Sequence, residues 1–189
     1  MGWAPGPAVD TDVTYRLDAK DVIVEVGGAW DEFARRNGGP GLEVDRVVGR
    51  SLYEHVTGEV TRMFVWTMFD AARKLGIERT QPYRCDTPDL KRFMEMRIVP
   101  GPAGTILVRH RLVSTEPIIP HVRVRAAMPG TPLRQVVLRC SSCNQLRHQG
   151  VWVEPEHLAK DVSGGDLDVQ VAYSICPSCR EAARLAPTR

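Results

Sequence analysis

The chain has 189 residues, enough for one medium-sized domain and a smaller second one. Hydrophobic residues make up 43% of it and charged residues 25%, so we expect an ordinary globular protein with a packed core. The formal net charge of +2 is too small to indicate a nucleic-acid-binding protein by itself.

The sequence also predicts where the protein is found. No run approaches the roughly 18 apolar residues of a membrane-spanning helix. The first residues, MGWAPGPAVDTD, lack the basic and apolar regions of a secretory signal. We therefore expect a cytoplasmic protein that does not associate with a membrane, in which paired cysteines serve metal or redox chemistry rather than disulfides.

Proline and glycine content divides the chain into four expected parts. These are a flexible tail at residues 1–12, an α+β domain at residues 13–116, a proline-rich linker at residues 117–136 and a small cysteine-containing module at residues 137–189. The linker contains several prolines, which disfavour a continuous helix or a central strand. A short edge strand around residues 122–125 is compatible with them.

The α+β part begins with two short strands, predicted at residues 14–18 and 21–26 and joined by a two-residue hairpin turn. A short helix is expected over residues 29–36, before an Asn-Gly-Gly sequence that ends it. Residues 51–55 are expected to form one more helical turn.

The longest predicted helix spans about residues 58 to 75 and ends at Gly76. Its apolar residues recur at helical spacing, which predicts a broad core face, with a dimer contact as the alternative: Val60, Phe64, Met68, Ala71 and Leu75, widened by Val65, Trp66, Phe69 and Ala72. Three strands follow at residues 81–86, 91–99 and 104–114.

This order of two strands, short helices, one long helix and three antiparallel strands resembles the PAS fold, the sensory module of bacterial signalling proteins. Two segments carry the resemblance, YRLDAKDVIVEVGGAWDEFA (residues 15–34) and DRVVGRSLYEHV (residues 45–56), and it covers residues 13–116. It implies an antiparallel sheet with flanking helices that senses a ligand, forms a homodimer or binds a protein partner. PAS domains bind flavin, haem, small acids or nothing, so the ligand is left open.

Two residues of this domain are candidate ligand-binding residues. His110 shares a strand face with apolar residues, so it is either a core histidine satisfied by its neighbours or a pocket residue, acting as an axial haem ligand or a hydrogen-bond donor. Cys85 is the cysteine without a partner in the sequence. It is either a buried inert thiol or a sensing thiol beside Arg84.

The segment RCDTPDLKR, residues 84–92, is dense in charge for a strand–turn–strand. We expect a solvated hairpin tip, because exposed charges of both signs are common there. The alternative is a cluster of Arg84, Asp86 and Arg92 that forms an anion site or a surface for a partner.

Four cysteines of the C-terminal part form two C-x-x-C pairs, Cys140 with Cys143 and Cys176 with Cys179, separated by the 32 residues 144–175. Each pair directs two sulfurs to one point, and together they supply the tetrahedral thiolate set that zinc prefers. A redox dithiol or inert thiols are the alternatives. Four thiolates leave no position for water, so Zn²⁺ is expected to be structural and to stabilise a segment with little core of its own.

Between the pairs we expect a strand at residues 151–153 and a helical turn at residues 155–160, and after Pro177 a helix. The stretch resembles a treble-clef or zinc-ribbon site and the zinc-type tail that follows PAS or receiver domains in bacterial signalling proteins. The resemblance covers residues 137–185 and is carried by Cys140, Cys143, Leu146, Arg147, Trp152, Ser174, Ile175, Cys176, Pro177 and Cys179.

No nucleophile–base motif, phosphate-binding glycine loop or pair of carboxylates occurs at a meaningful spacing, so an enzyme is not expected. The leading hypothesis is a signalling protein whose PAS domain senses a small molecule or dimerises, and whose zinc module docks on a protein partner. One alternative is a zinc-dependent transcriptional regulator that binds nucleic acid through arginines in or near the linker. These are Arg123, Arg125, Arg134, Arg139 and Arg147. The other is a thiol-redox protein.

Overall fold

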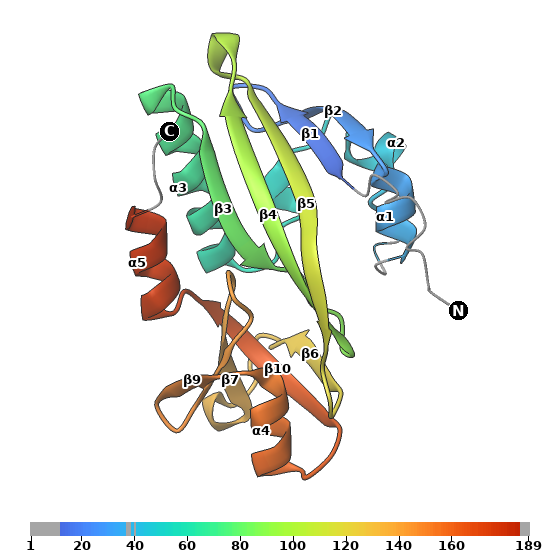
Figure 1. Cartoon of the computed structure of the whole chain (residues 1–189), viewed down its shortest axis with the longest axis vertical. Coiled ribbons are helices and arrows are strands. Elements are labelled where there is room, and N and C mark those ends of the chain that lie inside the picture. The colour runs from blue at the N-terminus through green and yellow to red at the C-terminus, as the bar shows by residue number, and fades with distance from the viewer. Residues whose placement is uncertain (1–11, 37–38, 40, 186–189) are drawn as a thin grey trace, which may run out of the picture.

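The structure is a computed structural model in which residues 12–36, 39 and 41–185 are described. The tail predicted at residues 1–12 lies outside the described residues, apart from Asp12. Two five-stranded sheets, with helices beside them, lie one above the other in Figure 1. This confirms the predicted α+β class.

The N-terminal unit, residues 12–117, contains the first sheet and three helices. Its elements are β1 (Val13–Leu17), β2 (Ile23–Gly28), α1 (Trp30–Arg36), α2 (Val44–Val47), the 3₁₀ turn η1 (Leu52–Glu54), α3 (Glu59–Leu75), β3 (Arg79–Arg84), β4 (Leu90–Pro100), the 3₁₀ turn η2 (Pro102–Gly104) and β5 (Ile106–Pro117). The strands pair antiparallel in the order β2-β1-β5-β4-β3. The predicted order of elements is therefore present, and α2 is an addition that the sequence pattern did not predict.

The connection between β1 and β2 is longer than the predicted two-residue turn. It runs over residues 18–22, and the Asp18 carboxylate accepts hydrogen bonds from the backbone N–H groups of Lys20 (2.8 Å) and Val22 (2.9 Å). A side chain that satisfies two backbone donors stabilises a wider loop.

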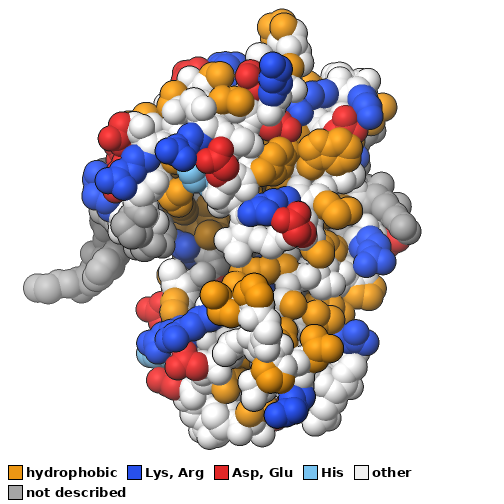
Figure 2. All heavy atoms as spheres, turned by 180° about the vertical axis from the view of Figure 1, so that it is seen from behind, with side chains coloured by type: hydrophobic (Ala, Val, Ile, Leu, Met, Phe, Trp, Pro, Cys, Tyr) orange, Lys and Arg blue, Asp and Glu red, His pale blue; other side chains and the backbone are white. Residues whose placement is uncertain are grey.

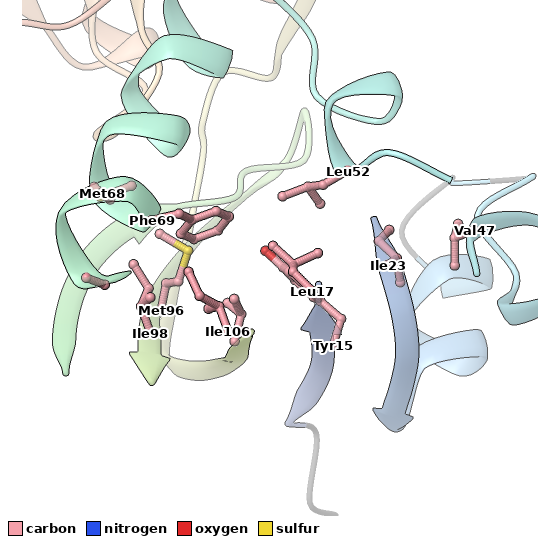
Figure 3. Close-up of a cluster of buried hydrophobic side chains, with 12 residues drawn as sticks. Tyr15, Leu17, Ile23, Val47, Leu52, Met68, Phe69, Met96, Ile98 and Ile106 are labelled. Carbon is pink, nitrogen blue, oxygen red and sulfur yellow. The ribbon is translucent and has the colours of Figure 1, made fainter. Parts of the chain in front are cut away.

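The core of the N-terminal unit lies between α3 and the sheet. Figure 3 shows Phe69 extending from α3 towards Met96 of β4, with Leu17 of β1 close by, and all three side chains are buried. Alternate residues of β1 and β4 face this core because strand side chains point to opposite faces in turn.

Helix α3 begins and ends nearly where the sequence predicts, and Gly76 closes it in the left-handed conformation (φ 65°), with its N–H bonded to the carbonyl oxygen of Ala72 at 2.9 Å. The predicted core face is partly wrong. Val60 is 39% exposed and Leu75 56% exposed, because the buried stripe runs through Met68, Phe69 and Ala72 instead.

The second sheet and two helices form the cysteine module, residues 122–185. Its elements are β6 (Val122–Ala126), the 3₁₀ turn η3 (Leu133–Gln135), β7 (Val136–Cys140), β8 (Leu146–His148), β9 (Val151–Val153), α4 (Pro155–Val162), β10 (Leu167–Ser174) and α5 (Pro177–Leu185). The strand order is β6-β10-β7-β8-β9. The predicted strand at residues 151–153, the helical turn from residue 155 and the helix after the second cysteine pair are all present.

The proline-rich segment at residues 117–136 contributes to this second sheet. Strand β6 lies at its edge and pairs parallel with β10, which confirms the short edge strand expected around residues 122–125. In Figure 1 the long strands β4 and β5 extend from the first sheet down to the level of β6.

Candidate metal centre and neighbouring cavity

Two parallel strands bring the cysteine pairs together. Strands β7 and β10 pair with Cys140 opposite Ser174, so both strands end at the same edge of the sheet. The N–H of Ser141 donates to the carbonyl oxygen of Ser174 at 2.8 Å, just beyond these ends. The first C-x-x-C therefore begins at the last residue of β7, the second begins two residues after the end of β10, and the two turns face each other.

The first cysteine turn is held by its own backbone. The N–H of Asn144 donates to the carbonyl oxygen of Cys140 at 3.0 Å, and the N–H of Cys140 donates to that of Gln145 at 2.9 Å. Asn144 has φ of 61°, a left-handed conformation that asparagine adopts more readily than most residues. This tight return directs the sulfurs of Cys140 and Cys143 to one side.

The second cysteine turn opens helix α5. Pro177 is its first residue, where the missing N–H has no intrahelical partner to lose. The N–H of Cys179 lies 3.4 Å from Cys176 Sγ, and the N–H of Cys176 lies 3.4 Å from Cys140 Sγ. Two backbone donors of the second turn thus point at one sulfur of each turn, as thiolates require.

The four sulfurs, of Cys140, Cys143, Cys176 and Cys179, lie within 4.8 Å of one another, and all four cysteines are free of disulfides. In a tetrahedral site with Zn–S bonds of about 2.3 Å, sulfurs lie about 3.8 Å apart. The distance between Cys143 Sγ and Cys176 Sγ is 3.8 Å. The donor set and spacing fit a zinc ion.

The thiols of Cys140, Cys143 and Cys179 affect one another's ionisation. Hydrogen bonds from the thiols of Cys143 and Cys179 lower the pKa of Cys140, and those bonds raise the pKa values of Cys143 and Cys179 in return. One sulfur can ionise at the expense of its neighbours, but four adjacent thiolates need a cation to balance their charge. The cluster is therefore suited to hold a metal ion such as zinc.

The first cysteine turn also contacts the N-terminal unit. The N–H of Arg84, the last residue of β3, donates to the carbonyl oxygen of Ser142 at 2.7 Å, and the side-chain amide of Asn144 donates to the carbonyl oxygen of Arg84 at 3.2 Å. The hydroxyl groups of Thr61 in α3 and Ser141 lie 2.7 Å apart. The end of β3 is thus hydrogen-bonded to the turn between Cys140 and Cys143.

An ion-pair network surrounds this junction. Arg84 binds Asp86 and Glu154, each at 2.6 Å, and Lys91 binds Glu154 at 3.1 Å and Glu156 at 2.5 Å. Arg84 is only 8% exposed and Lys91 6%, so the expectation of a solvated hairpin tip is wrong for these charged residues, although Pro88 and Asp89 at the tip are exposed. The charges are buried because carboxylates of the cysteine module cover them.

A cavity of about 450 Å³ lies beside the same junction, between β1, β5 and the segment that contains α1. Its lining includes both candidate ligand-binding residues, His110 and Cys85. Most of the remaining lining is apolar or aromatic: Val13, Tyr15, Trp30, Phe33, Ala34, Leu42, Tyr83 and Pro88. Gly39, Asp86, Thr87 and Arg92 complete it.

His110 is packed between two tyrosines. Its ring stacks on Tyr15 with centroids 5.5 Å apart, and its Nδ1 lies 2.7 Å from the hydroxyl oxygen of Tyr83. Burial lowers the pKa of His110 from 6.5 to about 4 and raises the pKa of Tyr83. His110 is therefore neutral at pH 7, satisfied by a neighbour and at the same time part of the cavity wall.

Cys85 is the first residue after the end of β3. Its N–H donates to the carbonyl oxygen of Arg92 at 3.0 Å, and Arg92 Nη2 lies 3.4 Å from its sulfur. The sequence predicted Cys85 as a candidate ligand-binding residue and Arg92 as part of a candidate anion site. It did not indicate that the aromatic residues line a cavity. They come from separate elements that only the fold brings together.

The face seen in Figure 2 carries no continuous basic surface. There, Lys and Arg side chains are interspersed with Asp and Glu, and hydrophobic side chains spread over the lower half. Arg123 lies 3.5 Å from Asp168, and Arg139 is half-buried. Within the described part of the chain, no helix combines the length and apolarity needed to cross a membrane.

No protein-family model and no curated protein matches this chain. Among solved structures, the chain is similar to a domain of an HTR-like protein from Haloarcula marismortui ATCC 43049. The two share 17% sequence identity at a TM-score of 0.42, and the match covers 55% of this chain and 98% of that chain. A likeness of this size carries no conclusion about function.

Proposed function

We propose that this chain is a regulatory signalling protein rather than an enzyme, with a PAS-type sensory unit joined to a structural zinc module. The sheet order β2-β1-β5-β4-β3, with all of the unit's helices between β2 and β3, supports the PAS assignment. A cavity of about 450 Å³ is within the size range of small-molecule sites and supports a sensing role.

The observation that carries this proposal is the double contact of one short segment. Arg84 is hydrogen-bonded to the first cysteine turn, whereas the residues directly after it, Cys85 to Pro88, line the cavity. A ligand that shifts this segment on entering the cavity also shifts the cysteine turn. A differential contact of this kind is what couples two sites.

Zinc has a supporting part in this proposal. Cys140, Cys143, Cys176 and Cys179 would hold it, and four thiolates leave no open position for a substrate or water. Bound zinc supplies folding free energy to the module, which presents its surface to a protein partner in the proposed output step.

The test is hydrogen exchange on the full chain with and without zinc, after confirming about one zinc per chain in the purified protein. Chelation of zinc is expected to raise exchange of the backbone N–H groups at residues 79–92 by about tenfold or more, because the cysteine turn releases Arg84. Residues 13–28, whose strands pair with each other and with β5 rather than with that turn, serve as the internal control. Unchanged exchange at residues 79–92 would contradict the proposed coupling.

A further inference from the structure

Arg92, near the start of β4, places a buried positive charge at the cavity. Its side chain is 8% exposed, its Nε donates to the carbonyl oxygen of Cys85, and its guanidinium carbon lies 5.6 Å from the centre of the Phe33 ring. The Cys85 sulfur is its third contact. None of these partners is a carboxylate.

The neighbouring buried cations, unlike Arg92, are paired with carboxylates. Arg84 and Lys91 each bind two carboxylates, whereas Arg92 forms no ion pair with any carboxylate among the described residues. Asp86 also lines the cavity, but Nε and Nη2 of Arg84 donate to its two oxygens at 3.1 and 2.6 Å, and its only contact with Arg92 among the described hydrogen bonds is with the backbone N–H, at 3.2 Å. Since a buried charge is more stable with a counter-ion beside it, the Arg92 guanidinium is suited to bind an anion.

The rest of the cavity fits an apolar, flat body. Tyr15 and Trp30 meet edge to face with centroids 6.0 Å apart, and Phe33 lies beneath the Arg92 guanidinium. Rings arranged in this way offer both faces and edges to an aromatic ligand. The Tyr83 hydroxyl and His110 add polar atoms to one wall.

We infer that the cavity binds a small organic monoanion with an aromatic body, such as a one- or two-ring carboxylate, whose acid group pairs with Arg92 while its ring lies among Tyr15, Trp30 and Phe33. This inference rests on the proposed sensory function and names the class of ligand sensed. A carboxylate forms two parallel hydrogen bonds with a guanidinium, which a neutral amide cannot match in charge.

The test is isothermal titration calorimetry on the zinc-loaded full chain with benzoate, phenylacetate and indole-3-acetate, each paired with its neutral amide. We expect at least one acid to bind about tenfold or more tightly than its amide. Arg92→Gln removes this preference, and Arg92→Lys retains part of it. The matched control is Arg111→Gln, an exposed arginine of β5 that binds Glu95 and leaves the preference unchanged.

Arg92→Gln also removes a hydrogen bond to Cys85 and can impair folding, so a second variant leaves the guanidinium untouched. Ala34→Leu fills part of the cavity and is expected to weaken binding of the acid and the amide together. Equal affinity of each acid and its amide for the natural protein overturns the inference. So does an absence of binding by all three acids at concentrations up to about 5 mM.

The two proposals fail separately. If no acid binds but chelation still releases residues 79–92, the coupling stands and the ligand class is wrong. If an acid binds through Arg92 but chelation leaves those residues unchanged, the binding site stands and the proposed signalling route is wrong.

Discussion

The guanidinium of Arg84 lies 2.6 Å from a carboxylate oxygen of Glu154, a residue 70 positions later in the chain. Glu154 precedes α4, and its carboxylate also binds Lys91 and the side-chain amide of Gln145. One side chain of the cysteine module therefore holds two buried cations of the N-terminal unit. The charged groups lower the pKa of Glu154 although its burial acts in the opposite direction.

Replacing Glu154 by Gln is expected to destabilise the protein by about 2 kcal/mol, because Arg84 and Lys91 remain buried with fewer counter-charges. Urea unfolding monitored by circular dichroism measures the change in the free energy of unfolding. Glu59→Gln is the matched control, since its exposed pair with Arg62 is worth less than about 1 kcal/mol. Equal effects of the two substitutions would show that the Glu154 network adds no stability.

Replacing Cys176 by Ser is expected to weaken zinc binding by at least about two orders of magnitude, since one thiolate of the four is lost. Cys85→Ser removes the cysteine outside the cluster and should leave the metal content unchanged. Metal analysis of the purified variants, with a competing chelator, checks both results. Zinc retained at full affinity by Cys176→Ser would remove this cysteine from the site.

Stability is expected to fall as the pH is lowered from about 6.5 towards 4, because burial depresses the pKa of His110 to about 4 in the folded protein. Between these values the unfolded chain binds the proton and the folded chain does not, so the contribution of up to about 3 kcal/mol is present above pH 6.5 and lost below it.

Acid also protonates cysteine ligands, so the measurement compares variants. Urea unfolding at a series of pH values should show a shallower loss of stability for His110→Gln than for the natural protein. His157→Gln, at an exposed position of α4, is the control and should keep the natural slope. Identical slopes for all three proteins would exclude His110 as the source.

Replacing Phe69 by Ala is expected to cost about 3–5 kcal/mol of unfolding free energy, because this fully buried ring fills the space between α3 and the sheet. Trp66→Ala lies on the same helix but at a position that is 50% exposed, and it should cost about 1 kcal/mol or less. Thermal and urea unfolding distinguish the two. A larger effect at Trp66 would indicate that its face is covered by another molecule, such as a second copy of the chain.

Local patterns in the sequence predicted much of this architecture. Gly76 ends α3 as expected, and the C-x-x-C spacing identified four sulfurs that the fold brings within one cluster. Both features depend on a few neighbouring residues or on the preference of one metal ion. The helix stripe was less well predicted, because helical spacing alone does not say which side of a helix the sheet covers.

The junction could not be predicted in the same way. Arg84, Lys91 and Arg92 have the composition of a solvated turn, and the carboxylates that pair with Arg84 and Lys91, those of Glu154 and Glu156, come from a distant part of the chain. Their burial is a tertiary effect that no local window contains. The cavity depends likewise on residues from several separate elements.

The hydrogen bond from the N–H of Arg84 to the carbonyl oxygen of Ser142 joins two backbone groups, and no side chain takes part in it. An alanine scan of this region would therefore leave it intact and would underrate the connection between the two sheets. Replacing the amide at residue 84 by an ester removes the donor itself. Natural sequences can likewise vary at residue 142 without breaking this bond, provided that the path of the backbone is kept.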